Sequence, residues 1–178
     1  GADPERVFMA GASNGGMMTY RFSCERAERL AGMAPVIAGV PAFVAESCGA
    51  AGSVPAIIFN GTDDPVVPFH GGPVGFSDRG LGAVISAPDS AALMAARNGC
   101  DATPLEEAFE DIADDDTSLR RWTYTDCGAA PVVFYIIDGG GHNVPGDNRG
   151  APEFLVGPYS EELDIPETAW AFFRDLAG

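Results

Sequence analysis

The sequence is poor in positive charge. Lysine is absent, all ten basic residues are arginine, and 26 acidic residues bring the formal net charge to −16. A surface of one negative sign repels phosphate backbones and anionic membranes. The composition therefore argues against nucleic acid or a membrane as a partner and favours a neutral or apolar one.

Long apolar runs and cofactor motifs are also absent. Hydrophobic residues make up 46% of the 178 positions, yet no apolar run approaches the roughly 18 residues of a membrane-spanning helix. The first residues, GADPERVFMAG, lack the basic and apolar regions of a signal peptide. We therefore expect any targeting segment to have been removed or to lie outside this sequence. No glycine-rich phosphate loop or cofactor signature occurs, and we expect no cofactor.

Metal-ligand spacing is missing too. The cysteines show no CxxC or Cys/His pattern, so zinc is not expected. Asp114–Asp116 lacks the spacing and the glycine of an EF-hand loop, which favours a solvated acidic loop over a calcium site.

The even number of cysteines favours disulfides over the free thiols of a cytosolic enzyme. The four are Cys24, Cys48, Cys100 and Cys127. Three pairings are possible. The sequential one closes loops of moderate length, each worth about 3 kcal/mol. Disulfides would indicate an oxidising compartment, so we expect a secreted or periplasmic protein.

The pattern of apolar residues predicts one α/β domain over residues 1–178. Short apolar runs predict strands at 6–10, 33–38 and 55–60, and a hairpin at 119–125 and 132–137, with 101–117 as an acidic loop. Helical spacing and caps predict helices at 16–30, 87–98 and from Asp164 onward, the last with Trp170, Phe173 and Leu176 facing inward. Alternating strands and helices indicate a sandwich around a mainly parallel sheet, which binds ligands beyond the carboxyl ends of its strands.

A G-x-S-x-G sequence, Gly11-Ala12-Ser13-Asn14-Gly15, lies directly after a predicted strand and directly before a predicted helix. This context is typical of a nucleophile elbow, in which the flanking glycines let a strained turn lift the serine oxygen clear of the sheet. The helix dipole and the free N–H of Asn14 can stabilise negative charge on a substrate oxygen. We expect Ser13 to be a nucleophile and Asn14 an oxyanion-hole donor.

An acid and a histidine follow two later strands. Asp63 and Asp64 come after strand 55–60, and either could orient a histidine. His142 comes after strand 132–137. His70, the other histidine and the rival base, lies in a loop, where we expect a position at the surface or at the edge of the substrate. The order nucleophile, acid, histidine is the order of α/β-hydrolases.

Four segments, ASNGGMMTYR, NGTDDPVVPF, AARNGC and GGGHNVPG, resemble blocks of the secreted polyhydroxybutyrate depolymerase and feruloyl esterase family of α/β-hydrolases. The resemblance spans nearly the whole chain and implies an α/β-hydrolase-type sandwich. It implies Ser13, Asp64 and His142 as the catalytic triad, and it supports a Cys100–Cys127 disulfide. Members often carry tryptophan where this chain has Val144, so the resemblance places Val144 at the substrate and removes an aromatic wall there.

The resemblance also implies that the N-terminal strands of the family are missing, because the elbow begins at Gly11. In the family a loop among those strands supplies the second oxyanion donor. Strand 6–10 would then have an open edge, and open edges pair with other chains. We expect a homo-oligomer or association with a separate N-terminal fragment.

These patterns favour a serine carboxylic ester hydrolase. Its substrates would be uncharged esters such as feruloyl or acetyl groups on polysaccharide, polyesters or short-chain acyl esters. One alternative is a peptidase or acyltransferase with the same triad, because that constellation serves all acyl transfer. Another is a non-catalytic, truncated remnant that acts as an oligomeric binding or structural module.

Overall fold

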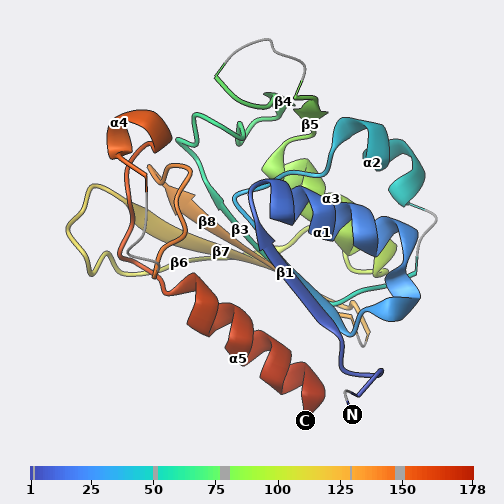
Figure 1. Ribbon diagram of the computed structural model, residues 1–178. Helices are drawn as coiled ribbons and strands as arrows, with labels where there is room; N and C mark the ends of the chain where they lie inside the picture. The colour runs from blue at the N-terminus through green and yellow to red at the C-terminus, as the bar shows by residue number, and fades with distance from the viewer. Residues whose placement is uncertain (2, 50–51, 77–80, 129, 147–150) are drawn as a thin grey trace.

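A six-stranded sheet runs through the computed structural model, which describes residues 1, 3–49, 52–76, 81–128, 130–146 and 151–178 (Figure 1). The strand order is β1-β2-β3-β8-β7-β6. The first four strands are parallel: β1 (Phe8–Ala12), β2 (Gly32–Val36), β3 (Ala56–Gly61) and β8 (Val132–Asp138). The last two, β7 (Ser118–Tyr124) and β6 (Leu105–Ala108), are antiparallel to their neighbours. The sheet is therefore mainly parallel, and its pairing of β7 with β8 confirms the predicted hairpin.

Helices cover both faces of the sheet. Three lie on one face: α1 (Asn14–Glu25), α2 (Ala42–Cys48) and α3 (Ala87–Arg97). The opposite face carries α5 (Ile165–Ala177), which contacts β2 and β3 (Figure 1). The short elements are η1 (Ala27–Arg29), α4 (Glu153–Val156), and the paired strands β4 (Gly72–Pro73) and β5 (Ala83–Val84). These three layers are compatible with an α/β sandwich.

The two faces of the sheet carry two separate hydrophobic cores. Ile58 and Phe134 pack into the core beneath α1 and α3, whereas Phe59 and Tyr135 pack into the core beneath α5. This alternation follows from the two-residue period of a strand. Because both faces are covered, β2 and β3 are buried along their whole length.

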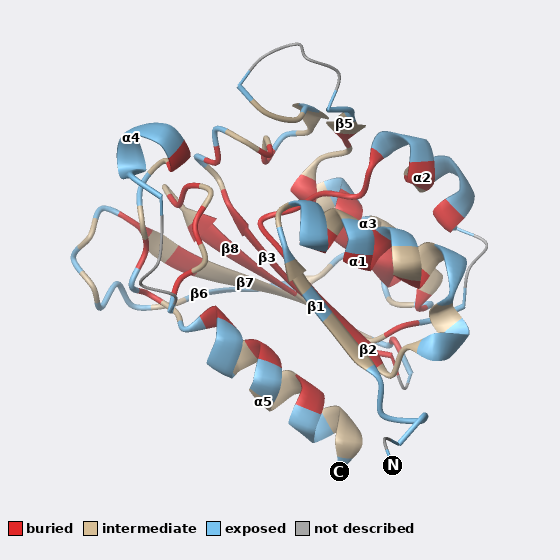
Figure 2. Ribbon diagram, viewed as in Figure 1, coloured by how far each residue is buried: buried red, intermediate tan, exposed pale blue. Residues whose placement is uncertain are grey.

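Strand β1 differs from these inner strands. It lies at one end of the sheet and, among the described residues, pairs with β2 alone. Ala10 and Ala12 are exposed. In Figure 2 the inner strands are red, for buried residues, whereas β1 is tan and pale blue, for intermediate and exposed residues. Within the residues that the structure describes, the strand that leads to Ser13 thus has an open edge.

Capping residues begin two of the helices, of which the cap at Asp164 was predicted. Asp164 accepts a hydrogen bond from the backbone N–H of Glu167 at 2.8 Å and begins α5. Ser86 accepts one from the N–H of Asp89 and begins α3. Each cap satisfies an N–H group that would otherwise lack a partner at the helix end.

Two predicted segments were wrong in extent. The helix predicted over 16–30 ends at Glu25, because Arg26 leaves the helical conformation and a 3₁₀ turn, η1, follows. The segment 101–117, predicted to be a loop, contains β6. Its four residues, LEEA, are all exposed and show no alternation of apolar and polar residues. Strand β6 is held instead by pairing with β7 and by an ion pair from Glu106 to Arg120 at 2.8 Å.

The inward position predicted for Trp170 was also wrong. Phe173 is buried and Leu176 is half-buried, but the Trp170 side chain is 65% exposed. Trp170 lies on α5 beside the open flank of β1, where the described residues provide nothing to cover it. The short elements α2, α4, β4 and β5 were not predicted, because each is too short for a hydrophobic period to show.

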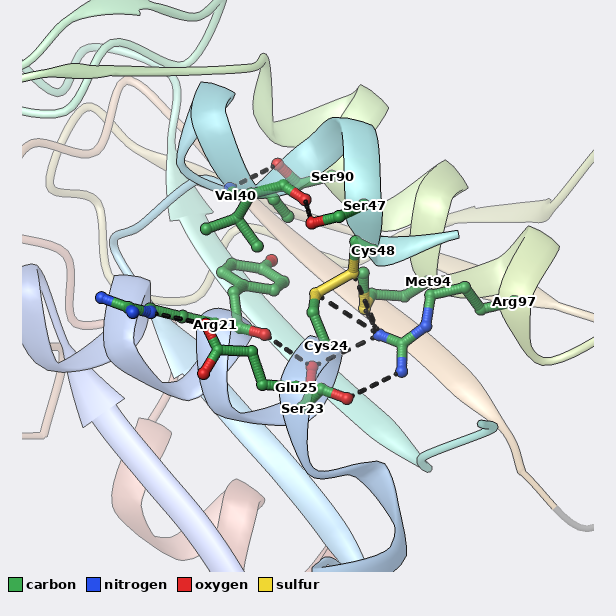
Figure 3. Close-up of a disulfide and its surroundings, with 12 residues drawn as sticks. Arg21, Ser23, Cys24, Glu25, Val40, Ser47, Cys48, Ser90, Met94 and Arg97 are labelled. Atoms are coloured by element: carbon green, nitrogen blue, oxygen red, sulfur yellow. Dashed lines mark hydrogen bonds and ion pairs between the residues drawn. A yellow bond between two sulfur atoms is a disulfide. The ribbon is translucent and has the colours of Figure 1, made fainter. Parts of the chain in front are cut away.

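Both sequential disulfides are present, Cys24–Cys48 and Cys100–Cys127. The first joins the last turns of α1 and α2, with Arg97 of α3 beside it (Figure 3). The Arg97 guanidinium donates to the backbone carbonyls of Ser23 at 3.0 Å and Gly52 at 2.7 Å, and it contacts the Cys48 sulfur at 3.4 Å. Burial lowers the pKa of Arg97. Helices α1, α2 and α3 are therefore tied together at this end.

Candidate active site

Ser13 lies in a sharp turn between β1 and α1. Its φ of 55° falls in the left-handed region, which is strained for a residue with a side chain. The turn is tight enough that a Cβ atom on Gly11 would lie 2.5 Å from the backbone carbon of Gly15. The Ser13 N–H donates to the carbonyl of Val36 on β2 at 2.9 Å, which anchors the turn to the sheet. Glycine at position 11 is thus required by close packing.

Asp64 lies in the turn after β3 and is buried. Its Oδ1 atom accepts hydrogen bonds from the N–H groups of Val66 and Val67, each at 2.8 Å. Its Oδ2 atom lies 2.7 Å from Nδ1 of His142. Asp63 is exposed, and its carboxylate accepts from the Thr62 hydroxyl instead. Of the two acids that the sequence left open, the structure brings Asp64 to the histidine.

His142 lies in the loop after β8 and joins the other two residues. Its Nε2 atom is 2.8 Å from the Ser13 hydroxyl oxygen, and its side chain is 12% exposed. With Nδ1–H donated to the Asp64 carboxylate, Nε2 is the acceptor for the serine proton. Residues from the ends of β1, β3 and β8 therefore form one hydrogen-bonded chain, which can activate a hydroxyl nucleophile.

The segment after α4 holds the histidine loop in place. The side-chain amide of Asn143 donates to the carbonyls of Gly157 at 3.0 Å and Pro158 at 3.1 Å. The Gly141 N–H also donates to Pro158, and a Cβ atom on Gly141 would overlap the backbone of Val156 and Gly157. Sequence reasoning missed this support. The run Gly139-Gly140-Gly141 was its one signal, since close backbone approach requires glycine.

Asn14 begins α1, directly after Ser13. The first N–H groups of a helix have no acceptor within the helix and lie at the positive end of its dipole. The Asn14 N–H is therefore available beside the Ser13 hydroxyl, where an oxyanion would form. Its role as an oxyanion donor stays a prediction.

Val144 and His70 are not part of the hydrogen-bonded chain of three residues. Val144 packs against the core beneath α5 and lines a groove with Ala12 and Trp170. His70 is exposed, and its ring meets that of Phe69 edge-on at 5.3 Å. The predicted contact of Val144 and His70 with a substrate stays a prediction.

The described residues contain no group of three or more His, Cys, Asp or Glu side chains arranged to hold a metal ion. Asp115, in the acidic loop considered for calcium, accepts hydrogen bonds from Thr117 and from the N–H of Glu161. Its carboxylate thus ties two loops together. None of the helices among the described residues is long and apolar enough to cross a membrane.

Comparison with known proteins finds relatives named as esterases. The chain is 32% identical to "Putative esterase NocK" of Nocardia uniformis subsp. tsuyamanensis over 96% of this chain and 51% of the relative. It is 28% identical to "Feruloyl esterase B" of Piromyces equi over 86% of this chain and 27% of that protein. It is 27% identical to "Probable feruloyl esterase C" of Aspergillus niger over 96% of this chain and 50% of that protein. No family model matches the chain.

These names support an esterase family at modest identity. The chain spans about half the length of two of these relatives and about a quarter of the third. The comparison thus agrees with the chemistry that the Ser13–His142–Asp64 arrangement can perform.

Proposed function

We propose that this chain hydrolyses carboxylic esters through an acyl-enzyme on Ser13, without a cofactor. The observation that carries the proposal is the chain of contacts from Ser13 Oγ to His142 Nε2 at 2.8 Å and from His142 Nδ1 to Asp64 Oδ2 at 2.7 Å. Nucleophile, base and orienting acid are within hydrogen-bond reach of one another.

In the first half of the reaction, Ser13 Oγ attacks the ester carbonyl carbon while its proton passes to His142 Nε2. The bond from this carbon to the alkoxy oxygen then breaks. His142 gives the proton to that oxygen, and the alcohol leaves. In the second half, water attacks the acyl carbon and passes a proton to His142. The bond from this carbon to Ser13 Oγ breaks, His142 returns the proton to Oγ, and the carboxylic acid leaves. The sum is ester plus water giving acid plus alcohol.

Two groups would stabilise charge along this path. The buried Asp64 carboxylate holds His142 in the required tautomer and stabilises the imidazolium. The N–H of Asn14 would donate to the oxyanion. One such donor is typically worth about 10² to 10³ in rate, so a second donor from outside the described site would raise the activity further.

The substrates we propose are uncharged esters: feruloyl or acetyl esters of polysaccharide, polyesters or short-chain acyl esters. The names of the relatives favour esters over peptides. The resemblance of the sequence blocks extends this to polyhydroxybutyrate depolymerases. The net charge of −16 disfavours anionic substrates. The two disulfides fit an oxidising compartment, and we propose a secreted or periplasmic location.

Covalent labelling tests the proposal directly. A fluorophosphonate should add one adduct to the native protein by intact mass, and Ser13→Ala should abolish it. The wild-type chain should also hydrolyse p-nitrophenyl acetate faster than a peptide p-nitroanilide. A folded native chain that is neither labelled nor active would overturn the proposal and favour a non-catalytic module, whereas faster cleavage of the anilide would indicate a peptidase.

A further inference from the structure

A cleft of about 150 Å³ opens beside the first turns of α1. Its walls come from three elements: α1, the start of α2 and the β4–β5 hairpin. Asn14 lies at its α1 side, together with Met18, while Phe43 comes from α2 and Val74 and Ala83 from the hairpin. The cleft therefore includes the residue whose N–H we propose as the oxyanion donor. Asn14 directly follows the proposed nucleophile, Ser13, along the chain.

The cleft is apolar, although its walls face solvent. Met18 is 51% exposed and Phe43 70% exposed, which is unusual for large apolar side chains that lie together. Arg21 is the one charged residue among those that line it. Its charge is paired with Glu25 at 2.8 Å, and its guanidinium lies over the Phe43 ring at 5.9 Å. Such a surface fits an uncharged apolar group.

The size of the cleft limits what it can hold. A cavity of about 150 Å³ with apolar walls accommodates benzene. The cleft thus has room for one aromatic ring or a short alkyl chain.

The position of His142 indicates which half of an ester lies there. His142 must protonate the leaving alcohol, so the alcohol lies toward the loop that carries this residue. Every lining residue of the cleft precedes that loop, in the range 14–83, and none belongs to the loop or to the segment after α4 that holds it. The acyl group, which stays on Ser13, is the part that can extend over α1 into the cleft.

A second groove, of about 360 Å³, is the rival site. It is lined by Ala12, Val144 and Trp170 and runs along the flank of β1 on the α5 face of the sheet. Asn14 is not among its lining residues. The groove is a continuation of the open edge of β1, whereas the cleft lies on the face that carries α1 and Asn14.

The cleft is also held in shape from behind. Helices α1 and α2, which form two of its walls, are joined at their far ends by the Cys24–Cys48 disulfide, and Arg97 donates to the Ser23 carbonyl of α1 and contacts the Cys48 sulfur of α2 (Figure 3). Preformed walls lower the entropy lost when a ligand binds.

We propose that the cleft between α1, α2 and the β4–β5 hairpin binds the acyl group of the ester, and that Phe43 selects short alkyl or aryl acyl groups. This inference rests on the proposed function. It deepens that function by assigning a subsite for one half of the substrate.

The test compares p-nitrophenyl butyrate and 3-phenylpropanoate with the acetate, so that only the acyl group changes. The measured selectivity is kcat/KM for each larger ester divided by kcat/KM for the acetate. Phe43→Ala should lower this selectivity by about tenfold, which is the lower end of the effect of one methylene in an apolar pocket. Ala83→Leu, which fills the cleft, should lower it too. Trp170→Ala, in the rival groove, is the matched control and should leave the ratio unchanged.

A second series, acetate esters of different alcohols, should keep the same order in wild type and Phe43→Ala. If Phe43→Ala and Ala83→Leu are both active and both keep the acyl selectivity of the wild type, the subsite assignment is wrong while the proposed function stands. A change in alcohol selectivity in Phe43→Ala, or a loss of acyl selectivity in Trp170→Ala, would also overturn the subsite assignment. A wild type that lacks fluorophosphonate labelling and acetate hydrolysis would overturn both proposals.

Discussion

Asp64 Oδ2 lies 2.7 Å from His142 Nδ1, while the Oδ1 atom of the same carboxylate accepts two backbone N–H groups. The carboxylate is thereby fixed in orientation and fixes the histidine ring in turn. Its neighbour Asp63 is exposed and does not contact the ring.

Asp64→Asn should therefore lower kcat for p-nitrophenyl acetate by about 10⁴-fold, because an amide in this place favours the wrong histidine tautomer. Asp63→Asn is the matched control, and its kcat should stay within a few-fold of wild type. Circular dichroism would verify that both variants fold. Equal losses of kcat in the two variants would show that Asp64 is not the acid that orients His142.

Asn143→Ala should reduce both stability and activity. It removes two hydrogen bonds that hold the His142 loop and leaves the Gly157 carbonyl without this donor, while the Pro158 carbonyl keeps the N–H of Gly141. Gly157 is half-buried and Pro158 exposed, so each lost bond should cost about 0.5–1.5 kcal/mol. Urea unfolding and the rate of fluorophosphonate labelling of Ser13 would measure the two effects.

Asn98→Ala is the control for this prediction. The Asn98 amide is buried, donates to the carbonyls of Val54 and Ala130 and accepts the Val54 N–H, but at the opposite end of the fold. We expect a loss of stability at least as large as that of Asn143→Ala, with labelling of the folded protein unchanged. If both variants slow labelling equally, Asn143 has no specific part in placing His142.

The sequence predicted the parts of the site that depend on local pattern. The turn at Ser13 follows from glycine spacing between a strand and a helix, and His142 follows from its place after the most apolar strand. The choice between Asp63 and Asp64 could not be derived from local pattern. It depends on which carboxylate the turn after β3 buries.

Contacts that depend on short or exposed elements were beyond sequence reasoning. The support of the histidine loop by Gly157 and Pro158 depends on α4, a helix of four residues with no hydrophobic period. Strand β6 has four exposed residues, so it is formed by pairing and not by burial. Trp170 was predicted inward because helical spacing shows a direction but not whether a neighbour exists to cover the side chain.

Replacing Cys24 and Cys48 together by serine should destabilise the chain by about 3 kcal/mol, from the loop entropy that the bond removes from the unfolded state. The Cys100–Cys127 bond closes a loop of similar length, with a separation of 27 against 24 residues, so its removal should cost about as much. Only the first pair ties α1 to α2. Selectivity among acyl groups should therefore change in the first double variant and not in the second, as p-nitrophenyl ester kinetics on the folded proteins would show.

Asp115 should make stability depend on pH in the acid range. Burial raises the pKa of Asp115, but hydrogen bonds from Thr117 and Glu161 outweigh this and hold it below the ordinary value of 3.8. A depressed pKa means that the stabilisation is present in full above pH 4 and is lost as the pH falls through the pKa of the folded state. Asp115→Asn should lower Tm at pH 7, and the difference from wild type should shrink below pH 4. Asp114→Asn, at an exposed neighbour, should show no such dependence in a calorimetric pH series.

The open edge of β1 should make the chain associate. Ala10 and Ala12 are exposed on this strand, and Trp170 lies beside it with 65% exposure, so an unpaired backbone edge and an apolar surface coincide. A separate N-terminal segment could cover this edge, but in a preparation of the chain alone the available partner is a second copy.

Light scattering should give a mass of at least twice 18.5 kDa. Because each copy carries a formal charge of −16, association should strengthen as salt screens the repulsion. Ala10→Glu should weaken it by placing a charge on the flank of β1, whereas Ala92→Glu, at an exposed position of α3, should not. A stable monomer at both low and high salt would show that the β1 edge needs no partner.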